Sequence, residues 1–215
     1  MSRSVWALAL AVLVAAGALP ADAQQGSEKL VVLIVGKPGS GKTTQARKIS
    51  KQYRIPSYSM AEILTKELGW VKTRFKKDMG VLVVSGDLVN DETANQLVTK
   101  YISQKKAANG FILDGYPTTS VQAAYLKAEL LTLGLPPPVV IHLELPEPVA
   151  EQRMLRRKRK DDTPENIRRR LGEYRVEEER LLSVLDPAWV HNVDGTPSEQ
   201  EVWRAVQSAL KTAGY

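Results

Sequence analysis

The feature that most constrains the fold is an apolar run, residues 30–35, that leads directly into a glycine-rich loop. The run reads Leu-Val-Val-Leu-Ile-Val, and the loop from Gly36 to Thr43 reads Gly-Lys-Pro-Gly-Ser-Gly-Lys-Thr. Such a run is typical of a strand buried on both faces, and a helical pattern follows the loop. Loop glycines let backbone N–H groups turn toward phosphate oxygens at the positive N-terminus of a helix. The combination predicts a strand, a phosphate-binding loop and a helix, and this context disfavours an accidental glycine-rich turn.

Two side chains of the loop have distinct expected roles. We expect the Lys42 ammonium to reach the β- and γ-phosphates of a nucleoside triphosphate, and the Thr43 hydroxyl to face Mg²⁺. The predicted nucleotide-binding residues of the loop are Gly36, Pro38, Gly39, Ser40, Gly41, Lys42, Thr43 and Thr44. The sequence therefore predicts that a triphosphate is bound here.

Residues 1–23 have the pattern of a secretory signal peptide. Arg3 gives a short positive start, residues 5–19 are an apolar run, and Ala-Asp-Ala at 21–23 matches a small-residue cleavage site. An uncleaved membrane anchor and a buried N-terminal helix are the alternatives, but the apolar run is short for a membrane span. We expect export of a mature domain, residues 24–215, to the periplasm or the exterior, without stable membrane association after cleavage. Retention in the cytoplasm is the alternative.

Charge and cysteine content narrow the class of partner. The chain has 215 residues, a net charge of +6 and no cysteine. Removal of residues 1–23 would delete one arginine and one aspartate, so the positive excess belongs to the mature domain. Its concentration between Arg153 and Arg170 favours a local phosphate site over a nucleic-acid-binding surface. The lack of cysteine excludes disulfides, a cysteine-bound zinc site and a lipoprotein anchor.

After the loop, short apolar runs alternate with helical patterns. Strands are predicted at 111–114, 139–143 and 190–193, and helices at 92–105, 121–133 and 149–159. The last helix is predicted to start with Thr196 as its cap, Pro197 in its first turn and Glu199 completing a capping box. Alternation of this kind predicts one α/β domain, a parallel sheet covered by helices on both faces, with ligands bound at the carboxyl ends of the strands.

Asp114 ends one of the predicted strands, so its carboxylate should lie at the same sheet edge as the phosphate loop. Mg²⁺ on a nucleotide is held by one or two protein oxygens and several waters. Thr43 and Asp114 are therefore the predicted metal-binding residues. The alternative is that Asp114 only caps the turn that follows it, whose sequence is Gly-Tyr-Pro.

Arginines between residues 153 and 170 form the second candidate site. Arg153 and Arg157 are four residues apart and share a helix face, and Arg159 and Arg170 flank the predicted loop and helix start at 161–164. Guanidinium groups stabilise the charge that phosphoryl transfer spreads over oxygen atoms. Any single arginine of this run fits a solvated surface position equally well, so the prediction rests on the cluster.

Four ordered landmarks resemble those of adenylate kinases and related nucleoside monophosphate (NMP) kinases. They are the loop at 36–42, Gly-Phe-Ile-Leu-Asp-Gly-Tyr-Pro at 110–117, Arg-Lys-Asp-Asp at 159–162 with Arg-Leu at 170–171, and Val-Asp-Gly-Thr at 193–196. The resemblance implies a P-loop core with two small insertions, an NMP-binding segment at 59–89 and a lid at 157–170. It also implies transfer of the γ-phosphoryl group of ATP to an NMP with Mg²⁺.

The resemblance further implies roles for individual residues. Lys42, Arg157, Arg159 and Arg170 would be catalytic. Arg153 and Gly195 would lie at the nucleotide donor. Ser59, Asp87, Val89, Gly115 and Gln122 would bind the acceptor.

The acceptor motifs depart from the family pattern at two positions. Thr65 and Thr118 stand where the family has arginines that hold the NMP phosphate. A charge-assisted contact of this kind contributes about 1.5–3 kcal/mol, so the loss of two weakens a site by orders of magnitude unless other groups replace them. The lid is also short, with one residue between Arg157 and Arg159.

Two hypotheses of different classes follow. The first is an NMP kinase of the adenylate kinase type, a monomer that binds nucleotides and no nucleic acid. The second is an exported nucleotide-binding domain or slow ATPase that has lost ordinary NMP kinase activity. Nucleic-acid binding through the basic stretch ranks below both.

Overall fold

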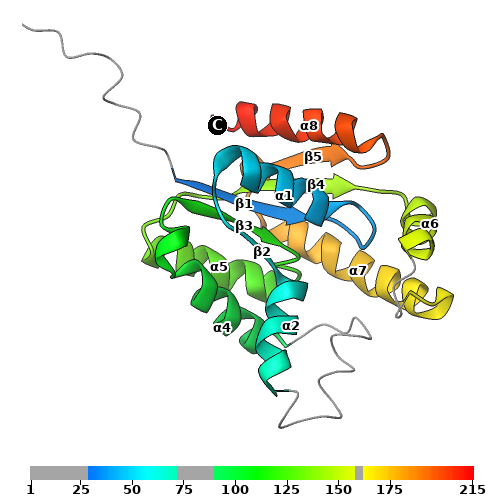
Figure 1. Cartoon of the computed structure of the whole chain (residues 1–215), viewed down its shortest axis with the longest axis horizontal. Helices are drawn as coiled ribbons and strands as arrows, with labels where there is room; N and C mark the ends of the chain where they lie inside the picture. The colour runs from blue at the N-terminus through cyan, green and yellow to red at the C-terminus, as the bar shows by residue number, and fades with distance from the viewer. Residues whose placement is uncertain (1–28, 72–89, 158–161) are drawn as a thin grey trace, which may run out of the picture.

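The computed structural model describes residues 29–71, 90–157 and 162–215 (Figure 1). Its strands are β1 (Leu30–Val35), β2 (Ser57–Ser59), β3 (Gly110–Asp114), β4 (Val139–Glu144) and β5 (Val190–Asp194). Its α-helices are α1 (Lys42–Tyr53), α2 (Met60–Val71), α4 (Asp91–Ile102), α5 (Ser120–Thr132), α6 (Glu147–Arg157), α7 (Pro164–Val184) and α8 (Glu199–Thr212), with short 3₁₀ turns at Lys105–Ala107 and Pro187–Trp189. No helix in these ranges is long and apolar enough to cross a membrane.

The five strands form one parallel sheet in the order β2-β3-β1-β4-β5. β1 is central, and every one of its residues is buried, as its continuous apolar run predicts. Because the strands are parallel, their carboxyl ends lie at one edge, where Val35 is paired with His142 and Ser59 with Asp114. The loop after β1 therefore lies beside the ends of β3 and β4.

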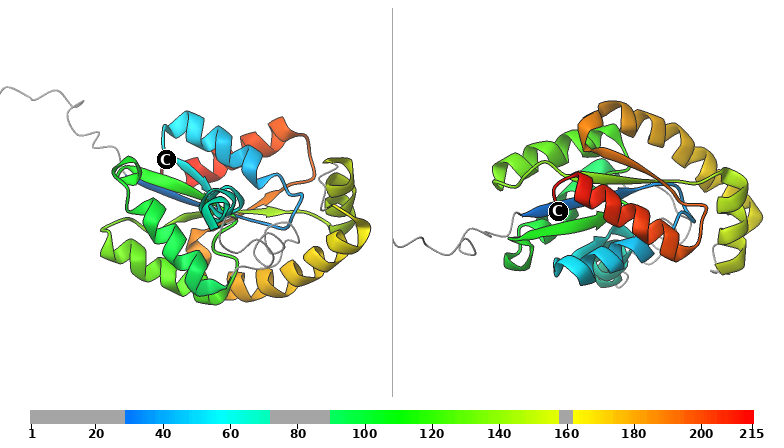
Figure 2. Two further views of the ribbon diagram at one scale, coloured as in Figure 1. Left: turned by 60° about the horizontal axis from the view of Figure 1, so that its bottom comes forward. Right: turned by 90° about the horizontal axis from the view of Figure 1, so that it is seen from above.

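Helices cover both faces of the sheet, which confirms the predicted fold class. Alternate β1 residues enter two different cores: Leu33 packs with α4, α5 and α7, whereas Ile34 packs with α1 and α8. Figure 2 shows the same division, with α8 and α1 on one face and α5 and α7 on the other. A smaller core joins α6 to the start of α7 through Met154 and Ile167.

The start of α8 differs from the prediction. The cap is Ser198, whose hydroxyl accepts a hydrogen bond from the Glu201 N–H, and the Glu201 carboxylate accepts one from the Ser198 N–H at 3.0 Å. Thr196 is held instead by Asp194, whose carboxylate accepts its N–H at 2.8 Å. The predicted cap at Thr196 and capping-box role of Glu199 were therefore wrong by two residues.

Candidate active site

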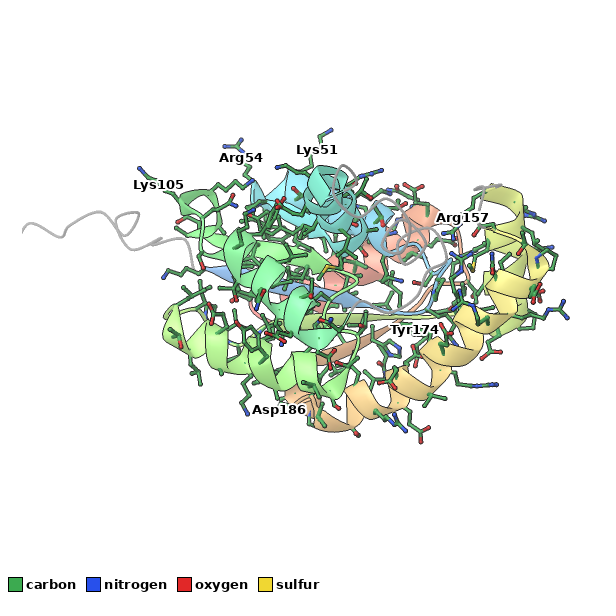
Figure 3. The ribbon with its side chains drawn as sticks, turned by 90° about the horizontal axis from the view of Figure 1, so that it is seen from below. Lys51, Arg54, Lys105, Arg157, Tyr174 and Asp186 are labelled. Carbon is green, nitrogen blue, oxygen red and sulfur yellow. The ribbon has the colours of Figure 1, made fainter. Side chains whose placement is uncertain are left out.

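A cavity of about 500 Å³ lies at the carboxyl ends of the strands. It is lined by the phosphate loop, the end of β3, the start of α2 and residues of α6 and α7. Figure 3 shows Arg157 and Tyr174 on this side of the molecule, whereas Lys51, Arg54 and Lys105 point outward elsewhere. The predicted site residues that line the cavity are Gly36, Pro38, Gly39, Gly41, Lys42, Thr43, Thr44, Ser59, Asp114, Gly115, Arg153, Arg157 and Arg170. Residues far apart in the sequence therefore meet in one site.

Two glycines of the loop have a backbone conformation and close contacts that disfavour a side chain. Gly36 has φ +141°, and a Cβ there would lie 2.6 Å from the Leu143 carbonyl oxygen. A Cβ on Gly39, at φ +87°, would lie 3.0 Å from the Ala150 carbonyl oxygen. The positive φ at both positions and the close approach at Gly36 favour glycine, so that the loop runs close to β4 and α6 and leaves its other side open to phosphate groups.

Lys42 lies at the first position of α1 and turns back over the loop. Its ammonium donates hydrogen bonds to the carbonyl oxygens of Gly36 and, at 3.1 Å, Lys37. Burial lowers the pKa of Lys42, while the nearby carboxylates of Asp114 and Glu178 oppose this effect. The charge is thus held inside the cavity, bound to the loop that is predicted to carry the phosphates.

Thr43 and Asp114 meet as predicted. The Thr43 hydroxyl donates to Asp114 Oδ2 at 2.6 Å, and Asp114 is 4% exposed. Two oxygen groups beside a phosphate loop are the donor set that Mg²⁺ uses when nucleotide phosphates and waters fill its other positions. The residues fit that ion, although no cluster of three acidic, histidine or cysteine ligands occurs in the described part of the chain.

Arg157 and Arg170 converge on one carboxylate. Arg157 donates to Asp162 through Nε at 2.6 Å and Nη2 at 3.0 Å, and Arg170 Nη2 donates to the same side chain at 2.6 Å. Burial alone would raise the pKa of Asp162, but the hydrogen bonds from both arginines lower it to about 2. Asp162 therefore supplies an internal anion where the arginine cluster was expected to receive phosphate oxygens.

This contact gives a pH-dependent stability prediction. The pKa of Asp162 is lowered in the folded state from an ordinary value of 3.8, so its stabilising effect is present above about pH 4 and is lost toward about pH 2. We expect Asp162→Asn to lower the free energy of unfolding by about 2 kcal/mol at neutral pH. The difference from wild type should shrink between pH 4 and pH 2. Urea unfolding at several pH values measures it, with exposed Glu179→Gln as the control; a difference that stays constant over this range would contradict the prediction.

Arg153 and Gly195, both predicted to lie at the donor nucleotide, are in contact. Arg153 Nη1 donates to the Gly195 carbonyl oxygen at 2.8 Å, and Nη2 donates to the Thr196 carbonyl at 3.0 Å. A Cβ on Gly195 would lie 2.8 Å from the Glu144 carbonyl oxygen, so the loop after β5 packs closely on β4. Arg153 therefore joins α6 to this loop at the cavity wall.

Two of the three predicted acceptor residues that the structure describes lie on the opposite wall. Ser59 and Gly115 line the cavity, but Gln122 is 2% exposed and is not part of the lining. Its Oε1 accepts the Thr118 N–H at 2.8 Å, and its Nε2 donates to Asp91 at 2.9 Å. Gln122 thus holds the loop after β3 in place, and its acceptor role stays a prediction.

Ser40 is 2% exposed and lies outside the cavity lining, with its N–H bonded to the Lys37 carbonyl at 3.1 Å. Tyr174, which sequence reasoning missed, lines the cavity and accepts the Gly36 N–H at 2.7 Å. Its spacing of four from Arg170 was the available signal, because such residues share a helix face.

Some predicted site residues lie outside the described part of the chain, namely Arg159, Asp87 and Val89. The same holds for parts of the two predicted insertions, 59–89 and 157–170.

Comparison with known proteins agrees with this geometry. The family model for adenylate kinase matches residues 34–187, from the end of β1 to the turn before β5. The chain belongs to the adenylate kinase family. It is 37% identical over 188 residues to an adenylate kinase of Clavibacter michiganensis, with 85% of this chain and 94% of that protein covered. It is 40% identical over 179 residues to that of Mycolicibacterium smegmatis, covering 83% and 98%. The chain is a phosphotransferase of the adenylate kinase type, with NMP kinase activity, and nothing favours the alternative of a domain without that activity.

Proposed function

We propose that this adenylate kinase family member transfers the γ-phosphoryl group of ATP to an NMP, with Mg²⁺ bound at Thr43 and Asp114. The observation that carries the proposal is that one cavity is lined by Lys42, by the Thr43–Asp114 pair, and by Arg157 and Arg170. These are the groups that phosphoryl transfer needs: positive charge around the transferred group and oxygen ligands for a divalent cation.

Each donor-side group has a chemical task. Loop N–H groups and Lys42 bind the phosphates, and the ammonium stabilises negative charge on the transferred group. Arg157 and Arg170 leave Asp162 for phosphate oxygens of the bound nucleotides, an exchange of one anion for another. Mg²⁺, when bound, neutralises charge on the phosphates. Closure of the cavity around both nucleotides would exclude water, which would otherwise accept the phosphoryl group.

The acceptor wall holds the NMP phosphate weakly in this proposal. Among the described residues, the cavity-lining cations are Lys42, Arg153, Arg157 and Arg170, all on the donor side. Thr118 lines the acceptor side but its hydroxyl is directed at Gln122, at 3.2 Å from Oε1, and the Thr65 hydroxyl donates to the Ala61 carbonyl at 2.7 Å. We therefore expect a high KM for the NMP with an ordinary KM for ATP.

A coupled phosphotransfer assay of residues 24–215 with ATP, Mg²⁺ and a panel of NMPs tests the proposal. ADP formation that depends on an NMP is the expected result. Release of inorganic phosphate without an NMP, or tight ATP binding without turnover, would contradict it and favour a slow ATPase or a binding domain.

We also propose that the protein is exported. The support is the sequence of residues 1–23, which begins with a positive charge, continues with an apolar run and ends in a small-residue cleavage site. Cell fractionation of a C-terminally tagged full-length chain tests this: the expected product lies outside the cytoplasm and begins near residue 24. A cytosolic product that retains residues 1–23 would contradict export.

A further inference from the structure

Lys37 is the one charged residue between Gly36 and Gly41, and it does not line the cavity. Its ammonium lies 3.8 Å from Glu178 Oε2 in α7, and neither residue lines the cavity. The side chains of Lys37 and Glu178 are only 16% and 15% exposed. A largely buried ion pair therefore joins the loop to α7, where solvent screens it less than at the surface.

The carboxylate of Glu178 is held from a second direction. His142 Nε2 lies 2.8 Å from Glu178 Oε1, and His142 Nδ1 lies 3.0 Å from Asn192 Oδ1. His142 pairs with Val35, the last residue of β1, and with Asn192 of β5. The cluster of Lys37, Glu178, His142 and Asn192 thus ties α7 and three strands together at the point where the phosphate loop begins.

α7 contacts the loop at a second point one turn earlier. Tyr174, four residues before Glu178, accepts the Gly36 N–H at 2.7 Å. Residues four apart share one helix face, so this face of α7 contacts two successive loop residues, Gly36 by its backbone and Lys37 by its side chain. The loop is therefore held by two groups of α7, of which Tyr174 lines the cavity and Glu178 does not, although the Glu178 charge also acts on Lys42.

We propose that Glu178 is a positioning residue for the phosphate loop, which it holds through Lys37 while His142 and Asn192 fix its carboxylate. The inference rests on the proposed binding of ATP by this loop. Preorganised donors bind phosphate with less loss of freedom than a mobile loop does, so the contact acts on ATP affinity and leaves the distant acceptor wall unaffected.

The pKa of His142 reports on the carboxylate of Glu178. Burial lowers this pKa, but the hydrogen bonds that the imidazole makes to Glu178 and Asn192, together with the negative charge of Glu178, outweigh burial and raise the pKa above its ordinary value. The charged groups facing this imidazole are Glu178 on α7, Lys37 behind it and Glu144 on its own strand, while β5 offers the uncharged Asn192. Removing the Glu178 charge should therefore lower the pKa of His142.

The test compares Glu178→Gln with Glu179→Gln, which changes the exposed neighbouring glutamate of the same helix. In the full-length protein we expect Glu178→Gln to raise the KM for ATP about tenfold, with the KM for the NMP unchanged. The NMR titration of His142, assigned with a His191→Gln variant because the chain has two histidines, should move to lower pH only in Glu178→Gln. Equal ATP KM values in the two variants would overturn the proposal.

Lys37→Met removes the loop partner of the same ion pair and leaves the contact between Glu178 and His142 in place. It is the second test variant, used if Glu178→Gln does not fold. We expect a similar rise in the KM for ATP, and little further rise in the double variant, because the two residues act as one contact. Effects that multiply in the double variant would overturn the proposal. A wild-type protein that does not bind ATP would instead refute the proposed function, so the two failures are distinguishable.

Discussion

Lys42→Ala is expected to reduce kcat for phosphoryl transfer by about 10²–10³-fold, the usual cost of removing one preorganised charge-stabilising donor. The ammonium is bound to the loop backbone at the carbonyl oxygens of Gly36 and Lys37. It can exchange those carbonyls for phosphate oxygens without leaving the cavity. A coupled phosphotransfer assay at saturating ATP and NMP measures the fall in kcat.

The matched control is Lys51→Ala in the same helix. Figure 3 shows Lys51 pointing outward, away from Arg157 and Tyr174, so its removal should leave kcat unchanged. Thermal unfolding of both variants separates a catalytic loss from a loss of folded protein. A Lys42→Ala enzyme that retains more than half of its kcat would contradict the role assigned to the ammonium.

Restoring arginines to the acceptor wall is expected to increase activity. Thr118 lines the cavity, and Thr65 lies one helical turn after Ala61, which also lines it, so arginines at both positions can reach the acceptor side. Each guanidinium should add about 1.5–3 kcal/mol of binding to the NMP phosphate, or about a tenfold or greater fall in the KM for the NMP. The KM for ATP should change little, because the donor side is untouched.

Thr132→Arg is the control for the charge itself. Thr132 is the exposed last residue of α5 and does not line the cavity. The Thr132→Arg variant should leave the KM for ATP and the KM for the NMP unchanged. If Thr65→Arg and Thr118→Arg, alone and together, fail to lower the KM for the NMP, then the acceptor phosphate is bound by groups other than those in the described wall.

The sequence predicted most of the sheet because β1, β3 and β4 are buried, and each of them is therefore a run of mainly apolar residues. β2 was not predicted, because Ser57–Ser59 is three residues long and contains two serines, so no apolar run distinguishes it from a loop. The cap of α8 was misplaced because Thr196 and Ser198 are both good caps, and only the turn after β5 decides which one the helix uses. That turn engages Thr196 through Asp194.

The donor site was predictable to the extent that its chemistry lies in short motifs. The Thr43–Asp114 contact follows from two motifs at the ends of neighbouring parallel strands. The contact of Tyr174 with the loop was not predictable, because Tyr174 lies 138 residues from Gly36 and its spacing from Arg170 indicates only a shared helix face. The sequence places Asp162 in a predicted loop, and its contacts with two arginines form only when the start of α7 is folded against α6.

One face of α7 carries Arg170, Tyr174 and Glu178 at intervals of four residues, and Leu181 further along is part of the core against the sheet. From Arg170 to Glu178 the helix rises about 12 Å, at 1.5 Å per residue. A helix is stiff over that length, so the arginine, the tyrosine and the glutamate must move together. Any displacement of the N-terminal end of α7 is therefore also a displacement of the groups that hold the phosphate loop, so Arg170 and the loop keep a fixed spacing within one donor site.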